Sequence, residues 1–275
     1  MSRNSIDTLC ISSFIGLTAV GMYNNYYFIM TGIVSFSIIV LNSMMASVGN
    51  SIAAERTEKN YTDMRRFDFI YTAIAGWATG CLLCLYQPFT TVWLGSKMIF
   101  GSSVVVAMCA YFYILKSGDI RWVYHEGAGL WYECRYIMIG EAVANIVLNI
   151  LLCKIWGVFG IILATVISVF VTNFFLCPRV LFKNYFKDMD IKEYWLDHIL
   201  YACTMLITAG ISWFACEGVL PIEMVSRKEI VSCILCLGGR LIICTSIAVL
   251  IFWFVWHRSE RYKSAVAWMK KMVKA

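Results

Sequence analysis

The chain contains few charged residues and almost no proline. Asp, Glu, Lys and Arg make up 15% of its 275 residues, and only three prolines occur, whereas charged residues average about 25% in soluble domains. Hydrophobic residues make up 60%, more than a soluble core of this size can bury. Apolar runs of about 20 residues span the hydrocarbon core of a bilayer as helices. The composition therefore excludes an ordinary soluble domain and predicts an all-α polytopic membrane protein.

The sequence also lacks the motifs that carry most enzymatic chemistry. It contains no nucleotide-binding loop, no HExxH and no nucleophile beside a plausible base, so we predict that the protein is not an enzyme. Two C-x-x-C pairs, Cys81 with Cys84 and Cys233 with Cys236, lie within apolar runs, where cysteine behaves as a small hydrophobic residue. No histidine lies at metal-ligand spacing from them, so a zinc or redox site is the weaker interpretation and no cofactor is predicted.

Seven apolar runs are long enough to cross a bilayer, and a shorter run precedes them. The short run, about residues 5–15, is predicted to be the second half of a helix whose first half is missing. The complete spans are predicted at about 19–53, 68–88, 99–120, 134–155, 157–181, 197–219 and 229–256. We therefore expect seven complete transmembrane helices plus one partial N-terminal helix.

Basic residues are concentrated in alternate gaps between these runs. The gaps at 54–67, 116–136 and 178–195 and the tail at 258–275 hold most of the 23 lysines and arginines. The positive-inside rule predicts that these gaps and the C-terminus are cytoplasmic. Because the charges are interleaved with membrane spans, the net charge of +6 does not indicate nucleic-acid binding.

The chain is predicted to comprise four parts. These are a partial helix with five spans (1–182), a cytoplasmic interfacial linker (183–195), two further spans (196–257) and a basic amphipathic tail (258–275). In the tail, apolar residues recur at helical spacing and basic residues occupy the other side, which suits a helix on an anionic leaflet. A simple stop-transfer tail is the alternative.

Polar side chains inside the predicted spans are the candidates for function, because they are costly in hydrocarbon. Arg240 lies near mid-membrane in the last span and is either a cation that lines a cavity or an arginine paired with another helix. Glu141, Asn145 and Asn149 are spaced four apart and form one polar stripe. This stripe predicts interhelical hydrogen bonds or a cavity lining. Asp7 is a lone acid that must find water or a partner.

Asn42 is a further candidate, on the 19–53 helix. Asn42 and Asn50 lie eight residues apart on one face of that helix, and we expect this face to share an interior with Asp7.

Three stretches of the chain carry family motifs. Residues 5–29 include D-x-x-x-I-S-x-F-x-G-L-x-x-V-G-x-Y-x-N-Y, residues 124–152 include AGLW, RY and EA, and residues 156–168 read WGVFGIILATVIS. Trp-Leu-Gly at 93–95 also fits. In this order, over about residues 5–182, they resemble the C-terminal half of bacterial polysaccharide flippases of the O-antigen type. These flippases belong to the multidrug/oligosaccharidyl-lipid/polysaccharide exporter superfamily.

The resemblance implies a MATE-like exporter fold of two helical lobes, of which this chain would hold the C-terminal one. It implies transport of lipid-linked oligosaccharide repeat units, of the undecaprenyl-pyrophosphate type, across the bacterial inner membrane for polysaccharide biosynthesis. The implied partners are this lipid-linked oligosaccharide, membrane lipids, and either a separate N-terminal lobe or polysaccharide-assembly proteins. The implied location is the inner membrane, with several passes and a cytoplasmic C-terminus.

A pyrophosphate head group with polar sugars needs a hydrated, partly cationic path through hydrocarbon. Given the resemblance, Arg240, Lys116 and Arg121 are expected to attract the phosphates, and Asn145 and Asn149 to bind sugar hydroxyls. The alternatives are a multidrug or toxic-compound exporter, and a non-transporting membrane fragment or scaffold. A membrane enzyme such as a polymerase or acyltransferase is the least favoured.

Overall fold

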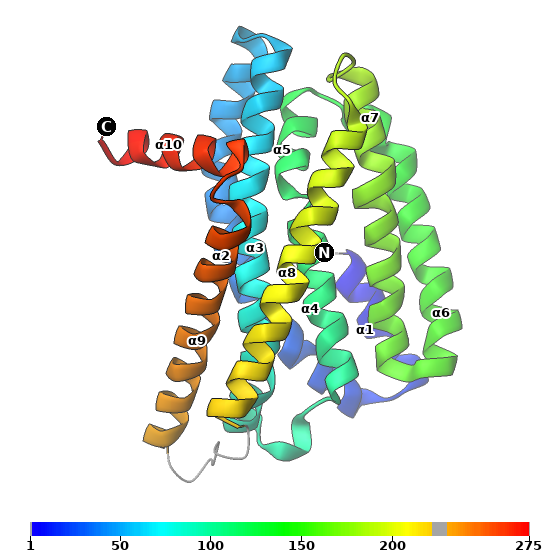
Figure 1. The fold of residues 1–275 in the computed structure, drawn as a ribbon. Coiled ribbons are helices and arrows are strands. Elements are labelled where there is room, and N and C mark those ends of the chain that lie inside the picture. The colour runs from blue at the N-terminus through cyan, green and yellow to red at the C-terminus, as the bar shows by residue number, and fades with distance from the viewer. Residues whose placement is uncertain (1, 222–229, 275) are drawn as a thin grey trace.

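The computed structural model describes residues 2–221 and 230–274, and within them it contains helices and short connections but no strand. In chain order the elements are α1 (Ser2–Phe14), α2 (Leu17–Ala54), α3 (Thr57–Leu94), η1 (Ser96–Met98), α4 (Ser102–Lys116), α5 (Asp119–Gly127), α6 (Trp131–Phe170), the π-helix η2 (Val171–Leu176), α7 (Cys177–Asn184), α8 (Ile191–Val219), α9 (Ile230–Trp256) and α10 (Glu260–Lys274). The long helices run side by side, and α10 turns away from them (Figure 1). The predicted all-α class is confirmed.

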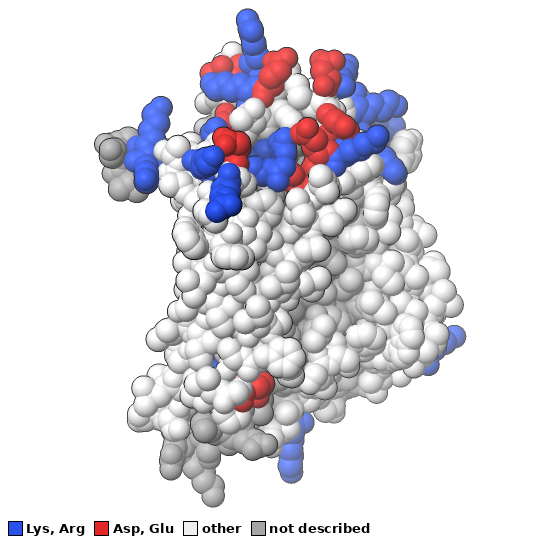
Figure 2. Space-filling model, in the orientation of Figure 1, with Lys and Arg blue, Asp and Glu red and all other residues white. Residues whose placement is uncertain are grey.

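Within residues 2–221 and 230–274, six helical segments are long and apolar enough to cross a membrane. They are Leu17–Ala54, Thr57–Leu94, Ser102–Gly127, Trp131–Asn184, Ile191–Val219 and Val231–Trp256. Figure 2 shows that charged side chains gather at one end of the bundle, above a broad belt without them. Many large apolar side chains on the helices are exposed, which is unfavourable in water but matches a lipid environment. The structure is thus that of a polytopic membrane protein.

The segment Trp131–Asn184 reverses direction at Gly157, where the backbone has φ 58° and ψ −132°. The side chains of Asn145 and Thr165, 20 residues apart, are hydrogen-bonded at 3.0 Å, whereas a straight helix would separate them by about 30 Å. Residues 131–156 and 158–170 therefore form two antiparallel arms of α6. The runs expected at 134–155 and 157–181 are separated at the predicted position.

Two charged gaps are more helical than the sequence suggested. The gap at 54–67 is mostly helix, because α3 already begins at Thr57. The linker expected at 183–195 is reduced to a turn between Asn184 and Ile191. There the Asp190 side chain caps α8 by accepting a hydrogen bond from the Lys192 N–H at 2.8 Å, which stabilises an early helix start. The expected start of the last span, residue 229, lies outside the described residues.

The tail forms the amphipathic helix α10, which lies across the end of α9 (Figure 1). Its apolar side packs on α3: the Trp268 and Phe67 ring centroids lie 5.3 Å apart, and Ala265 is 1% exposed. The Arg66 guanidinium also donates to the Ser264 hydroxyl at 2.7 Å. The tail is thus an amphipathic helix, and α3 provides the surface on which it docks.

The reversal at Gly157 yields a test of the hairpin. Gly157→Ala is expected to lower the free energy of unfolding by about 1–3 kcal/mol, because a side chain is strained at a φ of 58°. Gly140→Ala is the control: Gly140 is helical, with open space where a Cβ would lie, so this variant is expected to gain up to about 1 kcal/mol. Unfolding in detergent micelles measures both, and equal effects would contradict the assignment.

Candidate functional site

Two clusters of buried polar side chains connect several helices of the bundle. The Asp7 cluster joins α1 and α2 to the two arms of α6, and its members are Asp7, Tyr23, Asn145, Asn149, Thr165 and Ser168. The Arg121 cluster joins α3, α4, α5, η2 and α8, and its members are Asp68, Ser117, Arg121, Asn173, Tyr194 and His198. Each of these twelve residues is at most 5% exposed.

The carboxyl group of Asp7 is the acceptor at the centre of the first cluster. One oxygen accepts a hydrogen bond from the Tyr23 hydroxyl at 3.1 Å, and the other from the Asn149 amide at 2.9 Å. The Thr165 hydroxyl lies 3.2 Å from both oxygens. The short helix α1 makes this possible, because it packs against both α2 and α6. Asp7, the single acid in its apolar run, is therefore hydrogen-bonded to other residues of the chain.

The two asparagines extend the cluster along α6. The Asn145 amide donates to the Thr165 and Ser168 hydroxyls at 3.0 and 3.2 Å, and the Asn149 amide donates to the Asn145 carbonyl oxygen at 3.3 Å. The interhelical hydrogen bonds predicted for this stripe are therefore confirmed. Glu141, one turn further along the stripe, is 7% exposed and lies near Cys177 of α7.

Asn42 does not join this cluster, contrary to the expectation that it shares an interior with Asp7. Asn42 is exposed, whereas Asp7 is 2% exposed. The reason is the position of α2: only 12% of its most apolar window is buried, so most of the helix, including Asn42 and Asn50, lies on the outside of the bundle.

Pro178 explains how the second cluster arises. Proline has no backbone N–H, so the Phe174 carbonyl loses the donor that a regular helix would provide. The chain widens into the π-helix η2, where the Cys177 N–H donates to the Thr172 carbonyl, five residues back. In this register the donor for the Asn173 carbonyl would again be Pro178. The widened register therefore removes the helical donor of the Asn173 carbonyl, and the regular register removes that of the Phe174 carbonyl.

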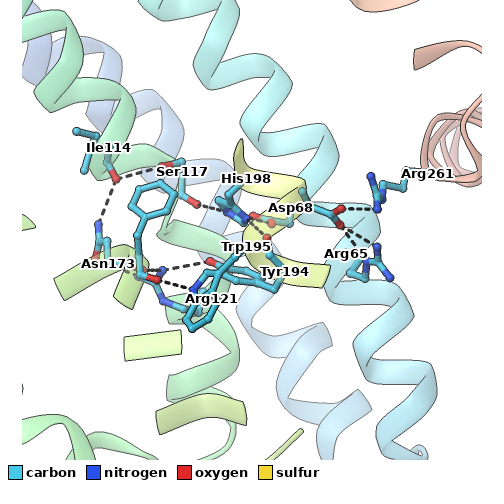
Figure 3. Close-up of polar contacts among 12 residues, drawn as sticks. Arg65, Asp68, Ile114, Ser117, Arg121, Asn173, Tyr194, Trp195, His198 and Arg261 are labelled. Carbon is cyan, nitrogen blue, oxygen red and sulfur yellow. Dashed lines mark hydrogen bonds and ion pairs between the residues drawn. The ribbon is translucent and has the colours of Figure 1, made fainter. Parts of the chain in front are cut away.

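Side chains from other helices fill both positions. The Trp195 indole N–H donates to the Phe174 carbonyl at 2.7 Å. The Arg121 guanidinium donates to the Asn173 carbonyl, to the Asn173 side-chain oxygen at 3.0 Å and to the Tyr194 hydroxyl at 3.2 Å. Figure 3 shows this guanidinium lying between α5, η2 and α8. Arg121, 1% exposed, therefore satisfies a break in the neighbouring helix.

His198 connects the Arg121 cluster to α3 and α4. One ring nitrogen lies 3.3 Å from the Asp68 carboxylate and 3.3 Å from the Ser117 carbonyl, and the other lies 3.1 Å from the Tyr194 carbonyl. Both ring nitrogens thus face oxygen acceptors (Figure 3). The sequence analysis did not select His198 or Asp68, although both stand at the edges of apolar runs, where a buried charge needs a partner.

An ion-pair network lies beside this cluster. The Arg65 guanidinium pairs with Asp197 at 2.9 Å and with Glu193 at 2.6 Å, and Arg261 of α10 pairs with the same Asp197. This network joins α3, α8 and α10 (Figure 3), and Asp197 at its centre is 3% exposed. From the sequence, these charged residues predicted only the orientation of the chain in the membrane.

The other two predicted cations are also buried and paired. The Lys116 ammonium group forms an ion pair with Asp119 at 2.5 Å, and Tyr71 donates to the same carboxylate at 2.6 Å. Arg240, on α9, donates to the Glu217 carboxylate at 2.9 Å and to the Cys84 carbonyl at 2.8 Å. The interpretation of Arg240 as an arginine paired with other helices is confirmed. Attraction of phosphate by these cations remains a prediction.

Both clusters consist of buried hydrogen bonds between side chains on different helical elements, and each includes a carboxyl group, that of Asp7 or Asp68. A change of hydrogen-bond partner in either cluster would therefore change how these helices pack. No family model, curated protein or solved structure matches this chain.

The Asp7 cluster can be tested by exchanging donor and acceptor. Asp7→Asn places an amide donor against the Asn149 donor, and we expect a loss of about 1–3 kcal/mol in the free energy of unfolding. Adding Asn149→Asp restores the match between donor and acceptor, so the double variant is expected to be more stable than Asp7→Asn alone.

The control adds the same charge at an exposed site. Asn50→Asp, on the exterior of α2, is expected not to rescue Asp7→Asn. Denaturant unfolding of all variants in one detergent compares them, and strictly additive effects of the two cluster substitutions would disprove the contact.

Proposed function

We propose that this chain is one helical lobe of a flippase that moves lipid-linked oligosaccharide repeat units across the bacterial inner membrane. In this proposal the chain crosses the membrane seven times, ends in the cytoplasm and corresponds to the C-terminal lobe of a MATE-like exporter. The observation that carries the proposal is the polar, uncovered side of α2.

Helix α2 is long and apolar but hardly packed. Its most apolar window is 12% buried, compared with 67% in Thr57–Leu94 and in Ser102–Gly127. Exposed polar residues nevertheless lie on it at positions 18, 24, 35, 42, 47 and 50, and three of them, at 24, 35 and 42, are spaced by 11 and 7 residues. This spacing places the three on one side of the helix.

A polar side chain that faces hydrocarbon is unfavourable, so this side of α2 is better suited to a hydrated cavity or a second protein body than to lipid. Both surround the substrate path in a transporter built from two lobes around a central cavity.

The first arm of α6 offers a cation for the substrate head group. The Arg135 guanidinium lies 3.2 Å from the centroid of the Tyr132 ring and 4.3 Å from that of Tyr136, and both tyrosines are 70% exposed. An arginine binds phosphate oxygens in a bidentate manner, and exposed aromatic rings present flat apolar faces to a sugar. Arg135 is therefore better placed to meet a pyrophosphate than the paired and buried Arg121, Lys116 and Arg240.

The buried candidates take a second role in the proposal. Alternating access requires helices to repack between two states. The Asp7 cluster and the Arg121 cluster hold helices together through polar contacts that can be exchanged, whereas the surrounding contacts are apolar. Asp7, Glu141, Asn145 and Asn149 are then groups whose partners change during transport.

A genetic experiment tests the function. Deleting the gene in its own cells is expected to abolish the surface polysaccharide and to leave its lipid-linked repeat unit on the inner leaflet, and the wild-type gene to restore export. Asn42→Leu and Arg135→Ala are expected to restore export at least about 10-fold less well, as for the loss of one charge-assisted or polar contact of about 1.4 kcal/mol or more.

Ser246→Leu is the matched control, since Ser246 is an exposed polar residue on α9, far from α2 in the chain, and full restoration is expected. Variant abundance in the membrane is measured in parallel. Unchanged surface polysaccharide after deletion would overturn the proposal. Increased sensitivity to toxic compounds would indicate a drug exporter instead, and no phenotype in either assay would indicate a scaffold.

The proposed topology has its own test. A reporter that is active only in the cytoplasm is expected to be active when fused at Lys59 or Lys187, and inactive at Lys97 or Lys154. These positions lie in turns or near helix ends on alternate sides of the proposed spans. The opposite pattern would invert the orientation, and the same activity at Lys97 and Lys187 would refute the seven crossings.

A further inference from the structure

Four cysteine side chains from three helices converge inside the bundle. Cys81 and Cys84 come from α3, Cys216 from α8 and Cys244 from α9, and together they form one buried group. Their exposed fractions are 8%, 1%, 0% and 1% in that order. The sequence places them up to 163 residues apart, so no motif connects the two in α3 with the others.

The sulfur atoms are spaced like ligands around a metal ion. The Sγ atoms of Cys84, Cys216 and Cys244 lie within 4.8 Å of one another, and those of Cys216 and Cys244 are 3.7 Å apart. A disulfide requires about 2.05 Å, so these two thiols are not bonded. Tetrahedral zinc with Zn–S bonds of about 2.3 Å separates its sulfur ligands by about 3.8 Å.

Buried cysteine alone is ordinary, because a free thiol packs as a small hydrophobic group. Two polar neighbours distinguish this site. The Ser212 hydroxyl is 0% exposed, lies beside Cys244 and has no hydrogen-bond partner among the described residues. Neutral thiols offer this hydroxyl only a weak acceptor, whereas a metal-bound thiolate is a strong one.

Arg240 is the second polar neighbour, and it is 1% exposed. Its guanidinium donates to the carbonyl of Cys84 at 2.8 Å, and its own carbonyl lies 3.8 Å from the Cys216 sulfur. The guanidinium is therefore held at the backbone of Cys84 and acts electrostatically on the sulfur of Cys216. Its positive charge would offset part of the negative charge of metal-bound thiolates. Arg240 therefore has a second role beside its ion pair with Glu217: it places a positive charge near the cysteine group.

We propose that Cys84, Cys216 and Cys244 bind one zinc ion, with Cys81 adjoining the site as the candidate fourth ligand. Cys81 precedes Cys84 by three residues and so lies on the same side of α3, in contact with Cys244. On binding, the coordinating thiols release their protons to solvent. The ion would link α8 and α9 to α3.

Charge balance favours zinc over monovalent copper, which also binds thiolates. Three thiolates with Zn²⁺ carry one net negative charge, whereas three thiolates with Cu⁺ carry two, and the nearby Arg240 guanidinium is already paired with Glu217. Uncompensated charge is costly in a medium of low dielectric constant. The inference does not depend on the proposed transport function.

Metal analysis of the full chain tests this proposal. The protein is purified in detergent from cells grown with added zinc and, separately, with added copper, and the metal content per chain is measured by mass spectrometry. We expect one zinc per chain after growth with zinc. Cys84→Ser and Cys216→Ser are expected to lower zinc affinity by more than about 10-fold, as the loss of a ligand contact does.

Cys203→Ser is the matched control, because Cys203 lies on the same helix as Cys216 and is exposed, and it is expected to retain the zinc. Zinc loss in this control equal to that in the ligand variants would overturn the site. So would a wild-type chain without zinc, or one that takes up copper in its place under both growth conditions.

A second measurement covers the case in which the serine variants do not fold. The wild-type chain is stripped with a chelator and titrated with Co²⁺, whose visible ligand-field bands and thiolate charge-transfer band report tetrahedral sulfur coordination. The bands are expected to saturate at one Co²⁺ per chain and to disappear when Zn²⁺ is added. Their absence would overturn the proposal, whether or not the variants fold.

Discussion

The absence of water in the hydrocarbon core is the constraint on which the rest of this structure depends. Backbone polar groups in the hydrocarbon core must find their partners within the chain. Pro178 shows the consequence: it leaves the carbonyls of Asn173 and Phe174 without helical donors, and Arg121 and Trp195 supply them from other helices. One residue without an N–H thereby determines where α5 and α8 meet η2. Arg121 is consequently a structural partner in this state.

The same constraint distinguishes the polar residues that hold the helices together from the polar residues that remain available for function. Asp7 binds the two arms of α6 to α1 and α2, because its carboxyl group accepts from Tyr23, Asn149 and Thr165. Once these contacts are made, the polar groups that stay uncovered lie on the outside, on α2 and at the exposed tyrosines of α6. An uncovered polar surface in a membrane helix points to water or a partner, and this is the basis of the transport proposal.

Sequence reasoning identified Asp7, Asn145 and Asn149 because a polar residue in an apolar run is conspicuous and the period of a helix places i and i+4 on one side. It did not identify the pairing of His198 with Asp68, or the sulfur group of Cys84, Cys216 and Cys244. Their members lie on different helices, 28 to 160 residues apart in the chain, and each resembles an ordinary core residue when considered alone. The prediction that Asn42 shares an interior with Asp7 was wrong for the same reason: the helical period shows on which side of a helix a residue lies but not which element packs against that side.

The sequence by itself determined the class of the protein, the approximate limits of its apolar helices, the break near Gly157 and the amphipathic tail, because these depend on local composition, period and backbone freedom. Only the tertiary structure decided which basic residues form ion pairs, that Asp7 is buried, which cysteine side chains are in contact and which side of α2 is exposed. Those outcomes depend on distances between helices, and a pattern along one helix contains no information on the neighbour that will pack against it.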